Sequence, residues 1–524
     1  MDFNKSGRNL ILYVFKLIFL GVLDSLAIWS AIILFNDTAY ILFAALVIGV
    51  ITINYVYLVD KAYPLRYILP GTLFMVALVV YPIFYTAYIS FTNYGTGNIL
   101  SKDQVIHQLE NKYYQPPEAE ELQFTAFKKP DQEEFAVLLE DEKGNLFLGI
   151  KGHAEKISSN DKRLKDNNND GEIDEINGYQ KLDQRKLYQN MGTLEELAFK
   201  RSDKDYLYRM ASATKFKAYE PQYEYNWEKG KLINLKTEKE YYPRDGFFRS
   251  DDGEKLTPGY RTYVGWENYR KLLTDQRIFQ PFLRVFLWTF QWALLSVFTT
   301  FVLGLFMAIL LNDKNLILRK FYRVILILPY AIPAFISVLI WRGLFNTEVG
   351  VINAILNTLS IASVPWMESV IWSRIALVIV NLWLGFPYMM LISLGALQSI
   401  PQNLYEAAAI DGASPWQRLK NITLPLLLVS LGPLLISSFA FNFNNFNIIY
   451  LFNEGGPAIA GSQTPAGGTD ILISYTYNLS FATGRGADYA LASTVTLFIF
   501  MITAIITWFN FKYTGALEEV KENV

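Results

Sequence analysis

Amide and aromatic side chains alternate in two strongly apolar stretches of the C-terminal half. The run 438–447, SFAFNFNNFN, interleaves Asn442, Asn444, Asn445 and Asn447 with four phenylalanines, and the run 380–388, VNLWLGFPY, adds Asn381, Trp383 and Tyr388. Amides donate and accept hydrogen bonds, and aromatic faces pack against the apolar face of a sugar ring. The pattern predicts a site for a neutral, hydroxyl-rich ligand. An alternative stays open, because intramembrane Asn also joins helices, at about 0.6 kcal/mol on average.

No pattern typical of a catalytic site accompanies these stretches. The sequence lacks the G-x-x-x-x-G-K-[ST] loop that cradles phosphates. Its two histidines, His107 and His153, do not have the spacing of a metal site or a triad, and there is no cysteine. We therefore expect no catalysis by this chain, and the net charge of −2 gives no reason to expect nucleic-acid binding.

The composition indicates a membrane protein, since 52% of the 524 residues are hydrophobic and only 18% are charged. A transmembrane helix needs about 20 mostly apolar residues. The stretches that meet this length are 10–35, 39–59, 67–90, 282–311, 320–341, 373–396, 424–452 and 488–511. They predict an all-α polytopic membrane protein with about eight transmembrane helices in a lipid bilayer.

Charged residues are concentrated between the third and fourth predicted spans. Residues 91–281 contain 30 Lys/Arg and 34 Asp/Glu, and runs such as 133–150 alternate around a turn at 141–145, as strands do. The predicted domains are therefore three N-terminal helices in 1–90, an inserted β-rich domain in 91–281, a core of five helices in 282–512 and a tail in 513–524.

The distribution of Lys and Arg in short loops predicts the orientation, because these residues are enriched on the cytoplasmic side. With the N-terminus inside, the inner loops contain Lys61, Arg66, Arg319 and Lys420 among others, whereas the outer loop 453–487 contains only Arg485. Both termini are then cytoplasmic, the 91–281 domain is extracytoplasmic, and the polar stretch 401–424 faces the cytoplasm.

The cytoplasmic stretch 401–424 has the signals of two short helices joined by a sharp turn. Pro401 and the helix formers after it begin one helix, Gly412 suits the end of that helix, and Ser414-Pro415 suits the start of the next. Pattern alone leaves open an ordinary amphipathic connector. The spacing Glu-Ala-Ala, Asp-Gly and Leu424-Pro425, however, resembles the loop through which ABC importer permeases contact their ATPase.

Further runs extend this resemblance. GWENYRKLL (265–273), YRVILILPYAIPAFISVLIWRGLFN (322–346), VNLWLGFPYMM (380–390), SFAFNFNNF (438–446) and TPAGGTDILISYTY (464–477) are together similar to the larger permease subunit of maltose/maltodextrin ABC importers. The similarity is closest from about residue 258 onward and weakest in the 91–281 domain. It implies the type I ABC permease fold and the binding-protein-dependent import of an oligosaccharide.

The resemblance also implies partners and site residues. The partners are a second permease subunit, a cytoplasmic ATPase dimer and an extracytoplasmic sugar-binding protein. The substrate-binding residues are Asn381, Leu384, Gly385, Tyr388, Ser438, Phe441, Asn442 and Asn445, with Asn444 and Asn447 better explained as interhelical contacts. The ATPase-coupling residues are Glu406, Ala407, Ala408, Asp411 and Gly412. One departure is Phe386, where related sequences can carry Tyr.

An acidic loop in the inserted domain follows the D-x-N-x-D-G-x-I-D pattern of calcium-binding loops. Asp166, Asn168, Asp170 and Asp174 would supply side-chain oxygens and Glu172 its carbonyl. Position twelve is Asn177 instead of a bidentate Glu, and the flanks do not resemble two helices. Both a structural calcium ion and a solvated acidic turn remain open.

Asp24 is a lone carboxylate in the first predicted span, where an acid is by default a functional candidate. Lys16 lies two turns away on the same face, so we expect a structural pair or a snorkelling arrangement instead.

Three classes of function can be distinguished by the sequence features expected of each. The leading prediction is a permease subunit of an ATP-driven importer of maltodextrins or of a different oligosaccharide. An ion-gradient-driven sugar transporter should show inverted repeats, which are not evident. A sensor should carry a cytoplasmic signalling domain, yet only about 13 residues follow the last predicted span. The inserted domain either contacts the sugar-binding protein or shields the outer mouth.

Overall fold

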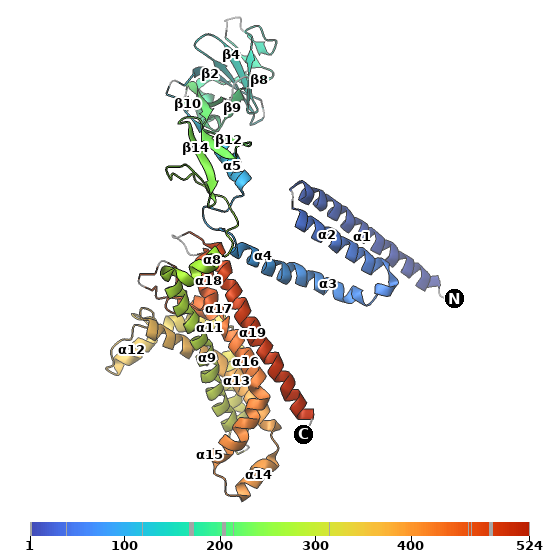
Figure 1. Ribbon diagram of the computed structural model, residues 1–524, viewed down its shortest axis with the longest axis vertical. Helices are drawn as coiled ribbons and strands as arrows, with labels where there is room; N and C mark the ends of the chain where they lie inside the picture. The colour runs from blue at the N-terminus through green and yellow to red at the C-terminus, as the bar shows by residue number, and fades with distance from the viewer. Residues whose placement is uncertain are drawn as a thin grey trace. The chain divides into compact units, whose positions relative to one another are not determined.

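The computed structural model describes residues 3–522 except 38, 118, 131, 167–171, 202–205, 213, 314, 460, 463 and 482–485. The chain divides into two compact units, Met1–Tyr88 and Ile89–Val524 (Figure 1).

The N-terminal unit is helical throughout. Its elements are α1 (Phe3–Asn36), α2 (Tyr40–Leu58), η1 (Asp60–Ala62), α3 (Leu65–Met75), η2 (Val76–Val80) and the first part of α4 (Tyr81–Ser90). A small core of Val56, Ala62 and Leu69 holds the corner between α2 and α3. Most other side chains of α1 and α3 are exposed, as expected for helices that contact lipid.

Of the two arrangements predicted for Lys16 and Asp24, a pair or snorkelling, the direct pair is wrong. The Asp24 carboxylate accepts a hydrogen bond from Asn54 Nδ2 at 2.7 Å, and Lys16 Nζ donates to the carbonyl oxygen of Tyr57 at 2.7 Å. Eight residues separate the two positions, which is about 12 Å along a helix, too far for direct contact. Asp24 nevertheless has a structural partner, because both polar groups join α1 to α2.

The inserted domain contains all the described strands. Its elements are α5 (Lys102–Glu110), β1 (Tyr113–Tyr114), β2 (Glu121–Lys128), β3 (Phe135–Glu140), β4 (Leu146–Ile150), β5 (His153–Ile157), β6 (Leu164–Lys165), β7 (Glu175–Ile176), β8 (Tyr179–Lys181), α6 (Gln184–Gln189), α7 (Met191–Glu195), β9 (Ala198–Arg201), β10 (Leu207–Ser212), β11 (Lys215–Pro221), β12 (Tyr223–Asn226), β13 (Lys231–Asn234), β14 (Lys239–Arg244) and β15 (Phe247–Arg249). The prediction of a β-rich insert is confirmed.

The larger sheet closes on itself. Its order is β1-β11-β10-β9-β5-β4-β3-β2-β8-β7-β6, and β11 also pairs with β2, so β2, β3, β4, β5, β9, β10 and β11 form a ring. Alternate residues such as Leu122, Leu139, Phe147 and Phe216 fill one core. The predicted turn between β3 and β4 forms at 141–145, where the Asp141 carboxylate accepts from the Asn145 amide at 2.7 Å.

The base of the insert is tied to the helical core. Asn268 Nδ2 donates to the carbonyl oxygens of Ser90 and Thr92 at 2.8 and 2.7 Å. The amide of Thr96 donates to the carbonyl oxygen of Ala487 at 2.8 Å, and the Ala487 amide donates to Thr96 Oγ1 at 2.7 Å. The insert therefore contacts the segment that begins the last long helix.

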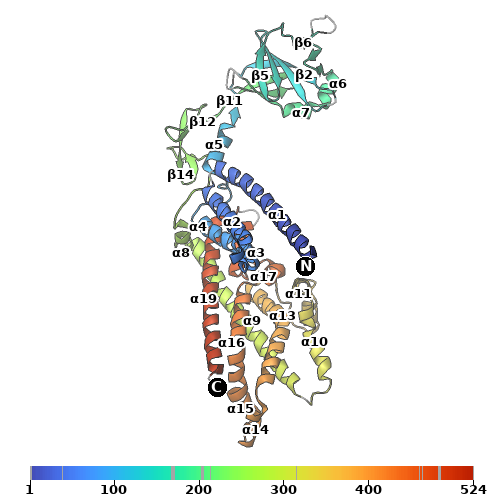
Figure 2. The same ribbon diagram turned by 90° about the vertical axis from the view of Figure 1, so that its right-hand side faces the viewer.

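The helical core follows the insert. It comprises α8 (Glu267–Thr274), α9 (Gln276–Asn312), α10 (Arg319–Ala331), α11 (Ala334–Leu344), α12 (Val351–Thr358), α13 (Val370–Ser399), α14 (Gln402–Ile410), α15 (Pro415–Arg418), η3 (Leu419–Thr423), α16 (Leu424–Phe443), α17 (Phe446–Asn453), α18 (Leu472–Phe481) and α19 (Tyr489–Glu522). In both views of the core, α14 and α15 lie at the end opposite α8 (Figures 1 and 2).

Each predicted span falls on a helix or a helix pair. Within the described residues, six helices are long and apolar enough to cross a membrane, and the bent pair α10–α11 would make a seventh. The second predicted span falls on α2, whose apolar part Leu42–Leu58 is shorter. The membrane-protein fold predicted from composition is confirmed.

Two predicted spans are not continuous. The fifth is bent by 90° between α10 and α11, because Pro333 has no amide hydrogen and keeps Ile332 extended, with φ −87° and ψ 133°. The seventh breaks at Asn444-Asn445, between α16 and α17, since Asn side chains compete with the helix for backbone hydrogen bonds. Both breaks border the cavity described below.

The contact between α9 and α13, the most extensive in the core, depends on Gly304. A Cβ at this position would lie 2.6 Å from Met389 Cβ and 2.7 Å from the Met390 amide nitrogen. We expect Gly304→Ala to force the helices apart and to lower the free energy of unfolding by about 1–3 kcal/mol. Thermal unfolding of the purified protein measures this. Gly395→Ala on α13, where an added Cβ meets nothing within 4 Å, should leave the melting temperature unchanged; equal effects would contradict the packing role.

Candidate functional site

A cavity of about 830 Å³ lies in the helical core, between α13, α16, the α10–α11 bend and the start of α17. All eight residues predicted to bind substrate line it, namely Asn381, Leu384, Gly385, Tyr388, Ser438, Phe441, Asn442 and Asn445. The described lining residues include no charged side chain. The structure therefore brings the predicted set together around a neutral hollow.

Asn442 is the best-defined polar group of the cavity. Its side chain is only 8% exposed, and its Nδ2 donates to the carbonyl oxygen of Ser438 at 2.8 Å. Its buried Oδ1 has no hydrogen-bond partner among the described residues. The backbone is fixed by Trp292, whose Nε1 donates to the Asn442 carbonyl at 3.1 Å. An unpaired buried acceptor costs about 1–3 kcal/mol, so a ligand hydroxyl that donates to it would remove this penalty.

The neighbouring asparagines differ from one another in their contacts and in their exposure. Asn444 Nδ2 contacts Thr503 Oγ1 of α19 at 3.4 Å, which confirms the prediction of an interhelical contact. Asn447 is exposed and lines the cavity instead. Asn381 is buried, at 6% exposure, and also lines the cavity.

Gly385 allows α13 to approach α9 beside the cavity. A Cβ on Gly385 would lie 2.8 Å from Thr300 Cγ2, and Thr300 itself lines the cavity. Phe386, the departure from the resembled pattern, is buried at 8% exposure and is not among the described lining residues. Its difference from Tyr therefore does not change the wall of the cavity.

One wall of the cavity comes from residues that were not predicted from the sequence. The α10–α11 bend contributes Pro329–Phe335 and Val338. Two prolines only four residues apart, Pro329 and Pro333, were the available signal, because proline inside an apolar stretch interrupts a helix and exposes backbone groups.

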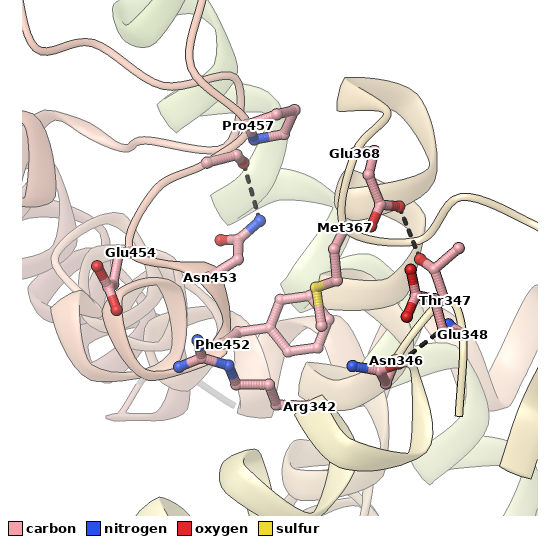
Figure 3. Close-up of a pocket in the computed structure, with 11 residues that line it drawn as sticks. Arg342, Asn346, Thr347, Glu348, Met367, Glu368, Phe452, Asn453, Glu454 and Pro457 are labelled. Atoms are coloured by element: carbon pink, nitrogen blue, oxygen red, sulfur yellow. Dashed lines mark hydrogen bonds between the residues drawn. The ribbon is translucent and has the colours of Figure 1, made fainter. Parts of the chain in front are cut away.

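A second cavity, of about 540 Å³, lies beyond the other end of α11 (Figure 3). Its lining includes Arg342, Glu348, Glu368 and Glu454, so its net charge is negative. Glu368 accepts a hydrogen bond from Thr347 Oγ1 at 2.6 Å, and Arg342 contacts the Leu451 carbonyl at 3.4 Å. This charged hollow is a poorer match for a neutral ligand than the first cavity.

The predicted helix-turn-helix at 401–424 is confirmed. Helix α14 ends at Ile410 and Gly412 follows its C-cap with a φ of +76°, and the amides of Gly412 and Ala413 donate to the carbonyls of Ala409 and Ala408 at 3.1 and 2.9 Å. This is the Schellman arrangement, which favours glycine. Ser414 caps α15 through a reciprocal pair of hydrogen bonds with Gln417.

The coupling residues predicted from the resemblance lie on this turn. Glu406, Ala407, Asp411 and Gly412 are exposed and Ala408 is half-buried. Two apolar side chains are also exposed here, Ile410 at 86% and Trp416 at 69%. Tyr405 anchors the turn to the core through a 2.9 Å hydrogen bond with Thr423 Oγ1. Exposed apolar groups on a rigid, anchored turn are typical of a docking surface.

The acidic loop of the insert joins β6 to β7, which pair as a hairpin. Asn168 and Asp170 lie outside the described residues, and the described part of the chain contains no group of three acidic or histidine side chains arranged to hold a metal ion. Glu172 pairs with Lys181, and the Asp174 amide donates to the Lys165 carbonyl at 2.9 Å. Neither of these two contacts involves the carbonyl oxygen of Glu172, which is the atom predicted to bind calcium. The calcium ligand set therefore stays a prediction.

Asp470 organises the segment between α17 and α18. The carboxylate is 1% exposed and accepts hydrogen bonds from the Gly467 amide and Ser474 Oγ, both at 2.7 Å, and from Asn478 Nδ2 at 3.2 Å. Burial raises the pKa of Asp470 to about 6. Gly455 must lack a side chain, since a Cβ there would overlap the Asp470 carboxylate at 1.9 Å.

The raised pKa of Asp470 predicts a pH dependence of stability. The folded state binds the proton more tightly than the unfolded state, so this carboxyl stabilises the fold fully below about pH 4 and loses that contribution as pH rises through 6. The loss is at most about 3 kcal/mol. We expect Asp470→Asn to reduce the difference in melting temperature between pH 5 and pH 7.5. Asp252→Asn, which removes a carboxyl whose pKa is about 2, should not; equal effects would contradict the assignment.

Comparisons with known proteins agree over most of the chain. Residues 300–515 match the family model described as binding-protein-dependent transport system inner membrane component. Residues 73–152 match the N-terminal region of the transmembrane subunit in binding-protein-dependent ABC transporters.

Individual relatives cover nearly the whole length. The maltose/maltodextrin transport system permease protein MalF of Klebsiella aerogenes is 36% identical over 505 residues, covering 94% of this chain and 95% of the relative. The MalF of Salmonella typhimurium is 37% identical over 471 residues, or 88% of each chain. Among solved structures, a bacterial ABC transporter that imports alginate has a TM-score of 0.41 and 23% identity, covering 48% of this chain and 84% of that one.

Proposed function

The chain belongs to the maltose/maltodextrin permease family of binding-protein-dependent transport systems, and from this we propose that it is the permease subunit of an ATP-driven importer of maltose and maltodextrins. The observation that carries the proposal is the convergence of eight predicted residues on one neutral cavity. Its partners are a second permease subunit, a separate ATPase that hydrolyses ATP, and an extracytoplasmic sugar-binding protein.

We assign the cavity of about 830 Å³ to the sugar. Tyr388 and Phe441 offer aromatic faces, and the amides of Asn381, Asn442 and Asn445 offer donors and acceptors for hydroxyl groups. The unpaired Asn442 Oδ1 supports this assignment. The chain alone forms one side of the pathway, and the second permease would complete it.

The proposed orientation places both termini in the cytoplasm and residues 91–281 outside. Lys and Arg are in excess in the short loops that lie on the same side of the membrane as the N-terminus, which supports this orientation. The position of α14–α15 also supports it, because they lie at the end of the core opposite α8, the helix that follows the insert. The chain has no cysteine, so single cysteines at Ile410 and Trp227, both exposed, can be labelled from one side at a time. Labelling of Trp227→Cys from the cytoplasmic side would overturn the orientation.

The turn between α14 and α15 is the proposed contact with the ATPase. In this mechanism, ATP binding closes the ATPase dimer, which moves α14 and α15 together, because Gly412 and the Ser414 cap make them one rigid piece. Tyr405 and the direct continuation of α15 through η3 into α16 transmit the motion to Asn442. The cavity then opens outward to receive the sugar, and ATP hydrolysis resets it.

The decisive experiment is reconstitution in proteoliposomes with the co-purified permease, ATPase and sugar-binding protein. We expect maltodextrins, presented by the binding protein, to stimulate ATP hydrolysis and to be taken up. Stimulation by another oligosaccharide alone would correct the substrate. Uptake driven by an ion gradient without ATP would reject the proposal.

We also propose a calcium ion in the loop 166–174, whose Asp and Asn spacing suits oxygen ligands. Extracellular modules bind calcium with dissociation constants on the order of 10⁻⁴–10⁻³ M. Isothermal calorimetry of the whole protein should detect such binding in the wild type and not in Asp170→Ala. Absence of heat from the wild type at millimolar calcium would contradict the site.

A further inference from the structure

A third cavity lies entirely within the N-terminal unit and has no role in the proposed function. It has a volume of about 570 Å³, and its lining includes Phe15, Lys16 and Leu23 of α1, Ile53 and Tyr57 of α2, and Phe74 of α3. We call it the α1–α3 wedge. Apart from Lys16, the described side chains that line it carry no charge.

The wedge arises from how the three helices meet. Helix α2 contacts both α1 and α3, and its residues Ile53 and Tyr57 lie between the α1 wall and the α3 wall of the cavity. Helix α3 starts from the corner core of Val56, Ala62 and Leu69 and then diverges from the α1–α2 pair (Figure 1). The divergence leaves two apolar walls that do not close on each other.

We propose that the α1–α3 wedge binds an anionic phospholipid, with an acyl chain in the wedge and the phosphate beside Lys16. The two helices that form its walls belong to apolar spans, Tyr13–Asn36 and Leu65–Ser90, whose side chains are almost entirely unburied by the other helices of the N-terminal unit. An empty apolar cavity is destabilising in proportion to its volume, and in a bilayer the molecule available to fill it is lipid. From Phe15 to Leu23 the α1 wall is about 12 Å long, which suits part of an acyl chain.

The charge at one end of the wedge selects the head group. Lys16 Nζ donates to the Tyr57 carbonyl at 2.7 Å, which leaves two of the three ammonium hydrogens for a phosphate. Lys61 and Arg66 follow α2 at this same end, where Asp60, which accepts from Arg66, is the one acid among the described residues. The excess of positive charge is complementary to an anionic head group and unfavourable for the amine of a zwitterionic one.

The test compares lipid retention by the assembled transporter. The complex is purified from mixed phosphatidylglycerol and phosphatidylcholine membranes, delipidated in mild detergent and weighed by native mass spectrometry. We expect the wild type to retain one phosphatidylglycerol per copy of this chain. Lys16→Gln should lower that occupancy roughly tenfold, since it removes one charge-assisted hydrogen bond. Lys320→Gln, which removes an exposed charge on α10 outside the wedge, should retain the lipid.

A second measurement identifies the occupant directly. Phe74 lines the wedge and is 67% exposed, so a benzophenone side chain at this position should cross-link to lipid acyl chains. Cross-linking to another subunit instead would overturn the proposal. Equal retention by wild type and Lys16→Gln, or equal retention of phosphatidylcholine, would overturn it as well. None of these outcomes depends on which sugar is transported.

Discussion

Gly412→Val is expected to reduce ATP-driven uptake roughly tenfold while leaving the fold of the core intact. Gly412 has a φ of +76°, a conformation that costs an ordinary residue about 1–2 kcal/mol and is worse for a β-branched one. A Cβ there meets nothing within 4 Å, so the whole cost is in the backbone. The turn would relax to another conformation, and α14 would no longer be fixed relative to α15. Uptake and ATPase co-purification in the reconstituted complex measure the effect.

A matched substitution separates backbone conformation from side-chain volume. Asn adopts the left-handed conformation far more readily than Val, so Gly412→Asn should retain most of the uptake. If Gly412→Val transports like the wild type, the rigid turn is not required. If Asn and Val are equally defective, the position instead needs a bare backbone against the ATPase.

The second large effect is expected from Asn442→Ala. This substitution removes the buried Oδ1 that lacks a protein partner and the Nδ2 that holds the Ser438 carbonyl. A sugar hydroxyl left unpaired in the cavity costs about 1–3 kcal/mol, which corresponds to roughly tenfold to hundredfold slower uptake at low sugar concentration. Basal ATP hydrolysis and complex assembly should not change, because the coupling turn is untouched.

Asn444→Ala is the control for this prediction. Asn444 is two residues away in the same helix end but contacts Thr503 of α19 and is not among the described residues that line the cavity. We expect a small loss of stability and normal uptake. If Asn442→Ala leaves uptake unchanged, or if both variants lose uptake equally, Asn442 does not contact the sugar.

Local patterns in the sequence determined the spans, the turn at Gly412 and the hairpin at 141–145. Each depends on a property that acts over a few residues: the length of an apolar run, the left-handed conformation of glycine, or the hydrogen bonds of an Asp side chain to its own turn. Such properties can be predicted from the sequence without knowledge of which other segments the residues contact. The pairing predicted for Lys16 and Asp24 failed because helical spacing put them on one face without bringing them into contact, and α2 supplied nearer polar groups.

Only part of the candidate sugar site could be predicted from the sequence. The alternation of Asn and Phe indicated polar groups in a membrane, and the family resemblance selected eight residues, but the pattern could not separate Asn444, which joins two helices, from Asn442, which faces the cavity. That distinction depends on where α16 ends and on which side α19 packs.

The sequence by itself therefore determined which segments enter the membrane, which segment is inserted, and which residue types could meet a sugar. The tertiary structure alone decided that α10 and α11 meet at 90° to form a wall of the cavity, that seven strands of the insert close into a ring, and that α3 diverges to leave a wedge beside Lys16. The physical reason is that these features arise from contacts between segments distant in sequence, where packing decides which of several locally acceptable conformations is kept.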